Sequence, residues 1–249
     1  MDVSLYQAAA AMSASTRWQE VIAENLAANQ VPGFKKQDLS FSAVQAGFLG
    51  GSSKTASAQH SAMPLAGTST NFQPGELRPT GVPTDLAIEG SAFFQVKMPD
   101  GSSAYTRDGE FRLTTQGQLV TKQGLPVLTQ SGPLQLDPSN GAPISISPTG
   151  DVSQGGQPVG QLKLAEFGNP GALEDAGTGL FVATNPAAQL RAATTSSVKQ
   201  GFLENANTSP MLEMGSLIAA MRFYEANQKV IQTEDERVSR LINDVANPT

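Results

Sequence analysis

The chain of 249 residues contains no cysteine and a single histidine, His60. These absences exclude disulfide frameworks, thiol catalysis and zinc sites built from cysteine and histidine. His60 has no acidic neighbour in the sequence to orient it, which argues against a histidine-based triad. Aromatic residues make up only 6% of the chain and are not interleaved with lysine or arginine, so a base-stacking surface is not supported.

Charge is also scarce. Charged residues make up 15% of the chain, against roughly 25% in ordinary globular proteins. The net charge of -6 lacks the basic footprint of a nucleic-acid-binding protein. No apolar run approaches the ~20 residues of a membrane span. The start of the chain is acidic at Asp2, and the first cation is Arg17, unlike a cleaved secretory signal. We therefore expect no nucleic-acid partner and no membrane span, and export by another route.

The N-terminal segment from Val3 to Ala28 is periodic. Small and apolar residues recur at alternating steps of three and four, which predicts a helix with the repeat of a coiled coil. Pro32-Gly33 ends this pattern. The seam consists of Leu5, Ala8, Met12, Ser15, Gln19, Ile22 and Leu26.

The C-terminal segment carries the same repeat with clearer boundaries. Ser209 is suited to the N-cap, Pro210 to the first helical position, and Glu213 to the first turn. A helix of ~36 residues from Pro210 to about Val245 is predicted, ~54 Å long. Its seam consists of Met214, Leu217, Met221, Tyr224, Gln228, Ile231, Asp235, Val238, Ile242 and Val245. A helix this long rarely lies inside a compact domain, so the two terminal helices are predicted to pair as a coiled coil.

The region between the helices has the pattern of short strands separated by turns. Strands are predicted at 86–88, 93–96, 104–106, 110–113, 118–121, 126–128, 144–147, 161–167, 180–183 and 198–203. The fold class is therefore mixed α and β, with an all-β domain inserted between paired terminal helices. Four parts are expected: an N-terminal helix at 1–33, an extended low-charge arm at 34–84, the β domain at 85–204 and a C-terminal helix at 205–249.

Catalytic motifs are missing from this pattern. No phosphate-binding loop and no EF-hand spacing occurs. Asp100 and Asp108 each precede a glycine, so their carboxylates are interpreted as turn formers rather than as a glycosidase pair. We expect no cofactor, no metal and no enzymatic activity. A carbohydrate-active enzyme stays an alternative that replacement of these two acids would test.

Two seams at the two ends of one chain indicate assembly. Neither end can bury its stripe on a polar β domain, but each can pair with the other and with neighbouring copies. Contacts that do not close on themselves produce a helical tube or filament. The expected interface residues are Leu5, Ala8, Met12, Ile22, Leu26, Met214, Leu217, Met221, Tyr224, Gln228, Ile231, Val238 and Ile242. Two alternatives stay open. One is a two-helix stalk that pairs only within the subunit, and the other is a phage-tail or adhesin-like β domain with oligomerising helices.

Several segments resemble one family, the axial proteins of the bacterial flagellar basal body (rod and hook). Residues 25–35 are similar to its N-terminal signature, and 85–109 and 115–120 to its β domain. Residues 200–207 resemble the turn before its C-terminal helix. The motif positions are Asn25, Leu26, Ala27, Gly33, Phe34 and Lys35, with Ala28 and Val31 where the family pattern has Asn and Thr.

This resemblance implies a structural subunit of the flagellar basal-body rod, located in the periplasmic part of the flagellum. It implies export by the flagellar type III apparatus without a cleaved signal, and partners among copies of itself and other rod proteins. The paired helices would line an axial tube that transmits torque, with the β domain outside. Residues 221–231, followed by Asp235-Glu236, are most similar to proximal rod components, with distal rod or hook-type proteins as the near alternative.

Overall fold

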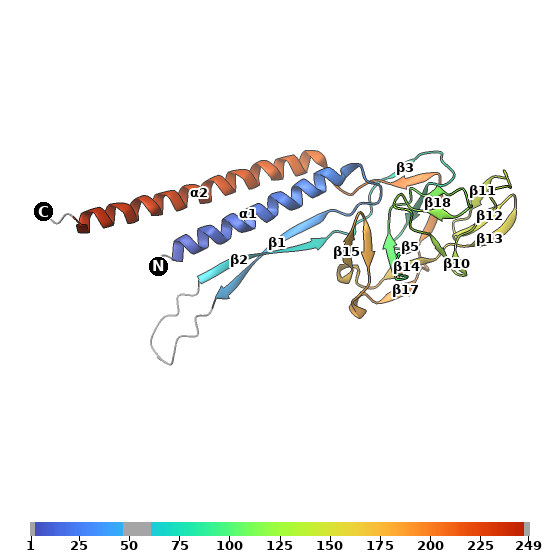
Figure 1. The fold of residues 1–249 in the computed structure, drawn as a ribbon, viewed down its shortest axis with the longest axis horizontal. Helices are drawn as coiled ribbons and strands as arrows, with labels where there is room; N and C mark the ends of the chain where they lie inside the picture. Colours follow the sequence, from blue (N-terminus) through green and yellow to red (C-terminus); the bar gives the residue numbers. More distant parts are fainter. Residues whose placement is uncertain (1–2, 47–60, 247–249) are drawn as a thin grey trace. The chain divides into compact units, whose positions relative to one another are not determined.

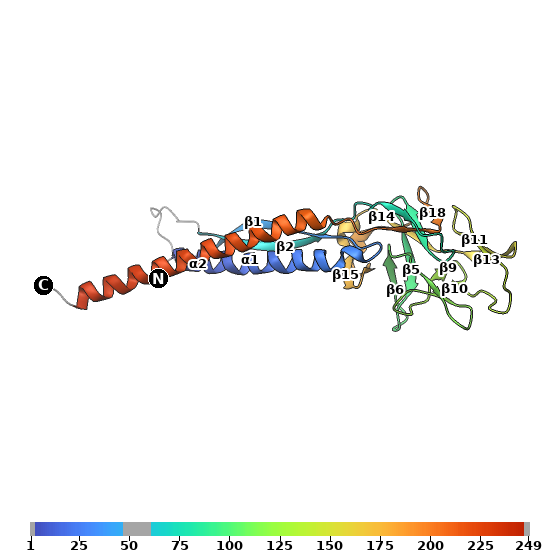
Figure 2. The same ribbon diagram turned by 90° about the horizontal axis from the view of Figure 1, so that it is seen from above.

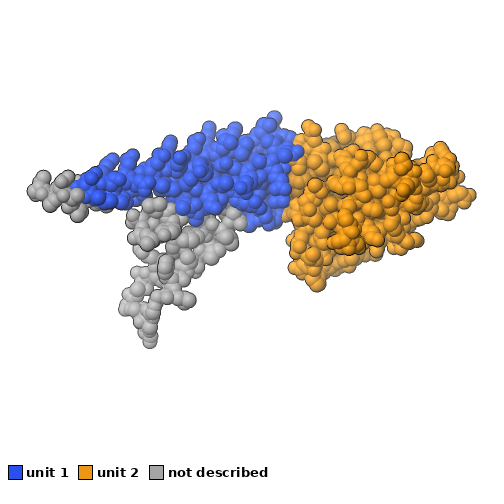
Figure 3. Space-filling view, in the orientation of Figure 1, with its two compact units in different colours: residues 1–27, 37–69, 209–249 blue, residues 28–36, 70–208 orange. Residues whose placement is uncertain are grey.

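A computed structural model describes the backbone of residues 3–46 and 61–246 (Figures 1 and 2). Side chains are described at 7–40, 67–240 and 242–243, so His60 and the side chain of Leu5 lie outside the described part. The chain forms two compact units, shown in different colours in Figure 3. Unit 1 contains Met1–Ala27, Gln37–Ser69 and Ser209–Thr249, and unit 2 contains Ala28–Lys36 and Thr70–Thr208.

Unit 1 is built on two helices, α1 (Val3–Ala27) and α2 (Pro210–Ala246). They lie against each other and run in opposite directions (Figure 1). Both predicted helices are confirmed to within a residue or two at each end. Coiled-coil packing of the pair stays a prediction.

Small side chains occupy the place where the two helices meet. The hydroxyl of Ser15 donates a hydrogen bond of 3.0 Å to the backbone carbonyl of Ala220. Both residues are fully buried, with 0% of their surface exposed. Ala8 and Ile22, one heptad before and after Ser15, are buried as well. A hydroxyl can reach the backbone of a neighbouring helix only where no bulky side chain intervenes, so small residues set this close approach.

Two strands complete unit 1. β1 (Gln37–Ala46) and β2 (Ser61–Thr70) form a two-stranded sheet, and β1 lies along α1. Backbone of the low-charge arm is extended at 37–46 and 61–70, while 47–60 lie outside the described residues. The arm at 34–84 as a separate part stays a prediction.

Unit 2 contains the β structure. Its largest sheet has six antiparallel strands in the order β15-β16-β6-β5-β14-β17. The bounds are β15 (Glu174–Gly177), β16 (Leu180–Val182), β6 (Ser103–Thr106), β5 (Phe93–Lys97), β14 (Leu164–Phe167) and β17 (Leu190–Ala192). A three-stranded sheet holds β11 (Ile144–Ile146), β12 (Asp151–Gln154) and β13 (Gln157–Gln161).

Four strand pairs and three short 3-10 helices complete unit 2. The pairs are β3 (Leu77–Pro79) with β19 (Phe202–Glu204), β4 (Leu86–Glu89) with β18 (Ser197–Gln200), β7 (Arg112–Leu113) with β8 (Leu119–Val120), and β9 (Leu128–Thr129) with β10 (Gly132–Pro133). The 3-10 helices are η1 (Ala28–Gln30), η2 (Pro170–Ala172) and η3 (Pro186–Ala188).

Every predicted strand segment overlaps a strand of the structure, although the segment at 126–128 shares only Leu128 with β9. Outside the low-charge arm, the strands that were not predicted are β3, β10, β12, β13, β15 and β17. They lack a long apolar or alternating run; β15, for example, reads Glu-Asp-Ala-Gly and is exposed throughout. Such segments become strands because a neighbouring strand offers hydrogen bonds, which their own side chains do not signal.

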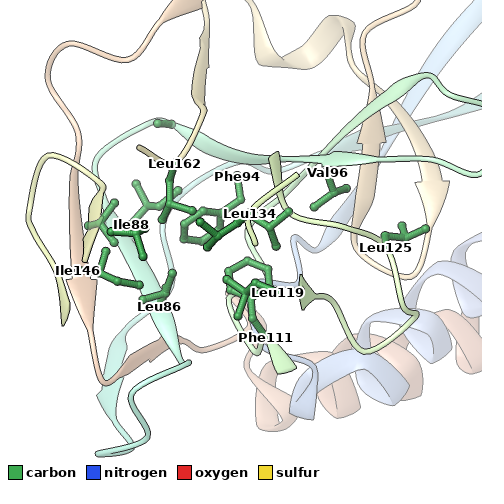
Figure 4. Close-up of a cluster of buried hydrophobic side chains, with 14 of the residues drawn as sticks. Leu86, Ile88, Phe94, Val96, Phe111, Leu119, Leu125, Leu134, Ile146 and Leu162 are labelled. Carbon is green, nitrogen blue, oxygen red and sulfur yellow. The ribbon is translucent and has the colours of Figure 1, made fainter. Parts of the chain in front are cut away.

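The hydrophobic interior of unit 2 has two parts on opposite faces of β5. Phe94 packs against Phe111 in the larger cluster, with ring centroids 5.1 Å apart (Figure 4). Phe93, its neighbour in sequence, lies in the other cluster, 5.6 Å from Phe167. Successive side chains of a strand point to opposite faces, so two adjacent phenylalanines support both clusters.

Candidate functional site

The predicted interface positions of α1 are mostly covered within unit 1. Ala8 and Ile22 are buried, and Met12 and Leu26 are half-buried. The side chain of Leu5 is not among those described. This seam therefore stabilises unit 1 itself.

The predicted positions of α2 fall into two groups. Leu217, Tyr224 and Ile231 are half-buried. The other positions are exposed: Met214, Met221, Gln228, Val238 and Ile242. The buried residues nearest to them are Glu213 and Ala220, each one position earlier than a methionine of the seam. Ala220 meets α1, and the adjacent Met221 and the earlier Met214 are about half exposed.

The apolar surface of α2 extends well beyond the predicted seam. Among the described side chains of this helix, nine large apolar ones are between 37% and 84% exposed. They are Met211, Leu212, Met214, Ile218, Met221, Phe223, Val230, Val238 and Ile242. Large apolar side chains exposed in this number are a reason to look for an interaction surface on α2. The predicted seam omits five of the nine. Met211 and Ile218 lie on the same side as Met214 and Met221, whereas Leu212, Phe223 and Val230 lie on other sides of the helix.

Gly33 of the family motif lies in a position that only glycine fits. Its φ angle is +68°, in the left-handed region. A Cβ atom there would lie 2.2 Å from the backbone carbonyl carbon of Arg107. The motif glycine therefore lets residues 28–36 pass directly over the strand region of unit 2.

Lys35 of the same motif is a completely buried cation. Its ammonium group donates to a carboxylate oxygen of Glu204 at 2.5 Å and to the carbonyl of Gln73 at 2.8 Å. Neither side chain of the ion pair has any exposed surface. The same Glu204 oxygen, Oε1, also accepts the backbone N–H of Gly75 at 2.8 Å. One carboxylate thus holds three segments that are far apart in the sequence.

Arg107 is a second buried cation on Glu204. One guanidinium nitrogen, Nη1, donates to Glu204 Oε2 at 3.3 Å, and Nη2 donates to the carbonyl of Gly90 at 2.7 Å. The guanidinium also lies 4.9 Å from the ring centre of Phe93. Within the described residues its Nε atom has no hydrogen-bond partner. Burial lowers the pKa of both Lys35 and Arg107, and the negative charge of Glu204 opposes that shift in each. We call Lys35, Arg107 and Glu204 the ion cluster.

Two asparagines close backbone connections beside these motifs. In unit 1, Asn25 donates to and accepts from the backbone of Gln37, both at 2.9 Å. In unit 2, Asn207 accepts the N–H of Lys36 at 2.7 Å and donates to the carbonyls of Asn71 and Gln73. Asn25 was predicted as a motif residue, and this pair of hydrogen bonds is its structural role.

The remaining motif positions are less constrained. Phe34 is buried, while Leu26 is half-buried and Ala27 exposed. Asn29, which follows the departure at Ala28, accepts a hydrogen bond of 2.8 Å from the hydroxyl of Thr208. Glu204 and Asn207 were not predicted as site residues. The sequence feature that could have identified them is their place in segment 200–207, which resembles the family.

The two candidate catalytic acids both support local turns. Asp100 accepts hydrogen bonds from the backbone and hydroxyl of Ser102, which lower its pKa. Asp108 accepts the backbone N–H of Glu110 at 2.9 Å. It is also buried, and burial raises its pKa to about 6. Turn chemistry predicted the hydrogen bonds, whereas the burial follows from tertiary packing.

A polar cleft of about 710 Å³ lies in unit 2. It is lined by 29–32, 73–76, Arg78 and 205–208. In the part of the chain that the structure describes, no group of acidic or histidine side chains is arranged to hold a metal ion. Neither described helix combines the length and apolar character needed to cross a membrane.

Comparison with known proteins gives a consistent result. Residues 87–154 match the family model described as the flagellar hook protein FlgE/F/G D1 domain, and residues 199–244 match the flagellar basal body rod FlgEFG protein C-terminal model. The chain is 35% identical to a flagellar basal-body rod protein FlgG of Borreliella burgdorferi, over 93% of this chain and 94% of the relative. It is 34% identical to a FlgF of Caulobacter vibrioides, over 95% of both chains. A FlgF of Mesorhizobium japonicum is 33% identical, over 97% of this chain and 98% of the relative.

Proposed function

This chain belongs to the family of flagellar basal-body rod proteins, and we propose that it polymerises through its terminal helices into an axial tube that transmits torque. As a member of that family it is a structural subunit of the rod. The proposal adds how the subunit assembles and how it carries load.

The exposed apolar surface of α2 is the observation that carries this proposal. Fully burying one such side chain contributes about 1.5–3 kcal/mol. Nine partly exposed side chains therefore offer on the order of 10 kcal/mol. Association costs about 4–15 kcal/mol of lost freedom, so a single contact between two copies is weak. Many such contacts, repeated along a tube, give a stable assembly.

The ion cluster supports the load-bearing role. Unit 2 is joined to unit 1 by chain crossings after Ala27, Lys36, Ser69 and Thr208. Inside unit 2, the segments that lead to these crossings are bonded to one another through Lys35, Gln73, Glu204 and Asn207. We propose that this network keeps the crossings from being pulled apart when force passes between the units.

We propose copies of this chain and other rod proteins as partners, and the periplasmic rod as the location. Delivery would use the flagellar type III export apparatus without a cleaved signal, since a chain without cysteine can be unfolded with no disulfide bond to break. A scaffold role without enzymatic activity accords with the turn-forming role of Asp100 and Asp108.

Position along the rod is a finer proposal. Relatives named FlgG and FlgF match at nearly equal identity, 35% and 34%. Residues 221–231 favour the proximal position over the distal rod or the hook.

The test is complementation of a strain that lacks this chain. We expect Phe223→Glu combined with Val230→Glu to abolish motility and to leave basal bodies without a complete rod. Leu190→Glu, at a somewhat more exposed leucine of β17 in unit 2, is the control and should restore motility. Normal rods with the double variant would contradict assembly through α2.

A further inference from the structure

One side of α2 carries a stripe of large side chains in its first turns only. Met211, Met214, Ile218 and Met221 follow each other at steps of three and four, and all are exposed. Farther along the same side the residues become polar: Glu225, Gln228, Gln232 and Asp235. At ~1.5 Å per residue the apolar part is ~15 Å long. We call these four residues the methionine stripe. Methionine adapts to irregular surfaces, which suits a contact between subunits.

The outer side of α1 has the opposite character. Its exposed residues include Ala9, Ser13, Thr16, Ala23 and Ala27, again at helical spacing. The hydroxyl of Thr16 is already bonded to the carbonyl of Met12 at 3.1 Å, so it needs no partner elsewhere. A face of small residues leaves a shallow groove on a helix, and ridges of large side chains pack into such grooves.

Charge decides how the two surfaces can meet. On α1, Arg17 borders the small-residue face and Glu20 lies within it, and the two form an exposed ion pair at 3.0 Å. On α2, Arg222 borders the methionine stripe and Glu225 continues it, and both are exposed. Both pairs have the order cation then anion, three residues apart. An antiparallel register that places Glu20 opposite Arg222 also places Arg17 opposite Glu225. A parallel register with the same overlap would oppose like charges, which is unfavourable.

In the antiparallel register three of the four stripe residues lie along the small residues near the end of α1, and Met211 extends past Ala27, where α1 ends. Ile218 falls between Ala23 and Ala27 of the facing helix, and Met214 falls beside Ala27. Met221 falls between Ala23 and Glu20. Glu24 lies beside Ile218 at the edge of the contact, one turn from Arg222, so no like charges face each other.

We propose that the methionine stripe of one copy docks, in this antiparallel register, against the outer face of α1 of a second copy. This inference rests on the proposed function and specifies which two surfaces meet. The two surfaces differ, so each copy offers one to the copy before it and the other to the copy after it. A heterologous contact of this kind does not close on itself and extends into a polymer.

Cysteine crosslinking tests the register, because the natural chain has no cysteine. Two differently tagged chains, Ala23→Cys and Ile218→Cys, are produced together in the strain that lacks this protein. Basal bodies are then oxidised with diamide, and a mixed disulfide between the two tags is expected. The control pairs Ala23→Cys with Gln232→Cys, on the same side of α2 but ~21 Å farther along, and should give no mixed disulfide.

Two outcomes would overturn this inference. One is a complete rod with no mixed disulfide, and the other is a disulfide only between two Ile218→Cys chains, which would mean a symmetric contact. In both cases rods still form, so the proposed function would stand while the docking register would fall. Failure of the unmutated chain to restore rods would instead refute the proposed function.

A charge exchange gives an independent measurement. Glu20→Arg alone and Arg222→Glu alone should each lower motility at least severalfold, while the chain with both changes should recover it. Both positions are exposed, so the fold of the subunit is retained. A double variant as impaired as the two single variants combined would exclude the proposed pairing.

Discussion

Replacement of Glu204 by glutamine tests the ion cluster most directly. The change keeps the shape of the side chain and removes its charge, which leaves Lys35 and Arg107 buried without an anion. The glutamine oxygen can still accept from Lys35 and Gly75, but its NH₂ group would face the donating Nη1 of Arg107. Loss of one partner from a buried ion pair costs about 3–5 kcal/mol. Whole domains are stable by about 5–15 kcal/mol, so the variant should be close to unfolding.

Urea denaturation followed by circular dichroism gives the free energy of unfolding, and hydrogen exchange of residues 93–106 shows that unit 2 is the part affected. The matched control is Glu89→Gln. Glu89 pairs with Lys199 at 2.9 Å, but the two side chains are 60% and 41% exposed. A surface pair of this kind contributes at most about 1 kcal/mol. Equal losses for the two variants would refute the importance of burial.

The pH dependence of Glu204→Gln adds a second readout. Burial holds the pKa of Lys35 below its ordinary value, and Glu204 is the group that opposes this shift most strongly. Without Glu204, Lys35 releases its proton more readily in the folded chain than in the unfolded chain. Stability of the variant should therefore rise as the pH increases toward the ordinary lysine pKa. A flat profile between pH 7 and 10 would contradict this explanation.

Three further predictions concern single positions. The folded Asp108 carboxyl keeps its proton to about pH 6 and the unfolded one loses it near 3.8, so stability present below pH 4 is lost as the pH rises to 6. Asp108→Asn should remove this decline and raise the free energy of unfolding at pH 7 by up to about 3 kcal/mol. Melting temperatures measured from pH 3 to 8 test this, and the same pH slope in the variant as in the unmutated chain would contradict it. Gly33→Ala should lower the free energy of unfolding, measured by urea denaturation, by more than about 2 kcal/mol. Gly124→Ala, with φ +84° but open space around it, should lower it by about 1 kcal/mol, and similar losses for the two variants would exclude the steric explanation. Ala220→Leu should destabilise unit 1 by about 1–3 kcal/mol in thermal unfolding because the larger side chain separates the helices. Ala219→Leu, at an exposed position, should be nearly neutral, and equal effects of the two variants would count against the close contact.

Local signals were enough to predict much of this fold. Pro210 and the apolar repeat placed α2 correctly, and Pro32-Gly33 marked the end of the first helical region. Apolar runs such as Phe93–Val96 identified the central strands. These features depend on residues a few positions apart, and such short-range preferences act in the same way whatever the rest of the chain does.

Tertiary structure alone decided which residues meet. Periodicity defines a helix face only to within about one residue. Ala220 is the fully buried residue that meets α1, and its small side chain lets the backbones approach, whereas Met221 of the predicted seam is half exposed. Lys35 and Glu204 are 169 positions apart, and nothing near either residue in the sequence indicates its partner. A buried charge needs an opposite charge within hydrogen-bonding distance, and the path of the chain through unit 2, including the close passage at Gly33, brings this carboxylate to that lysine.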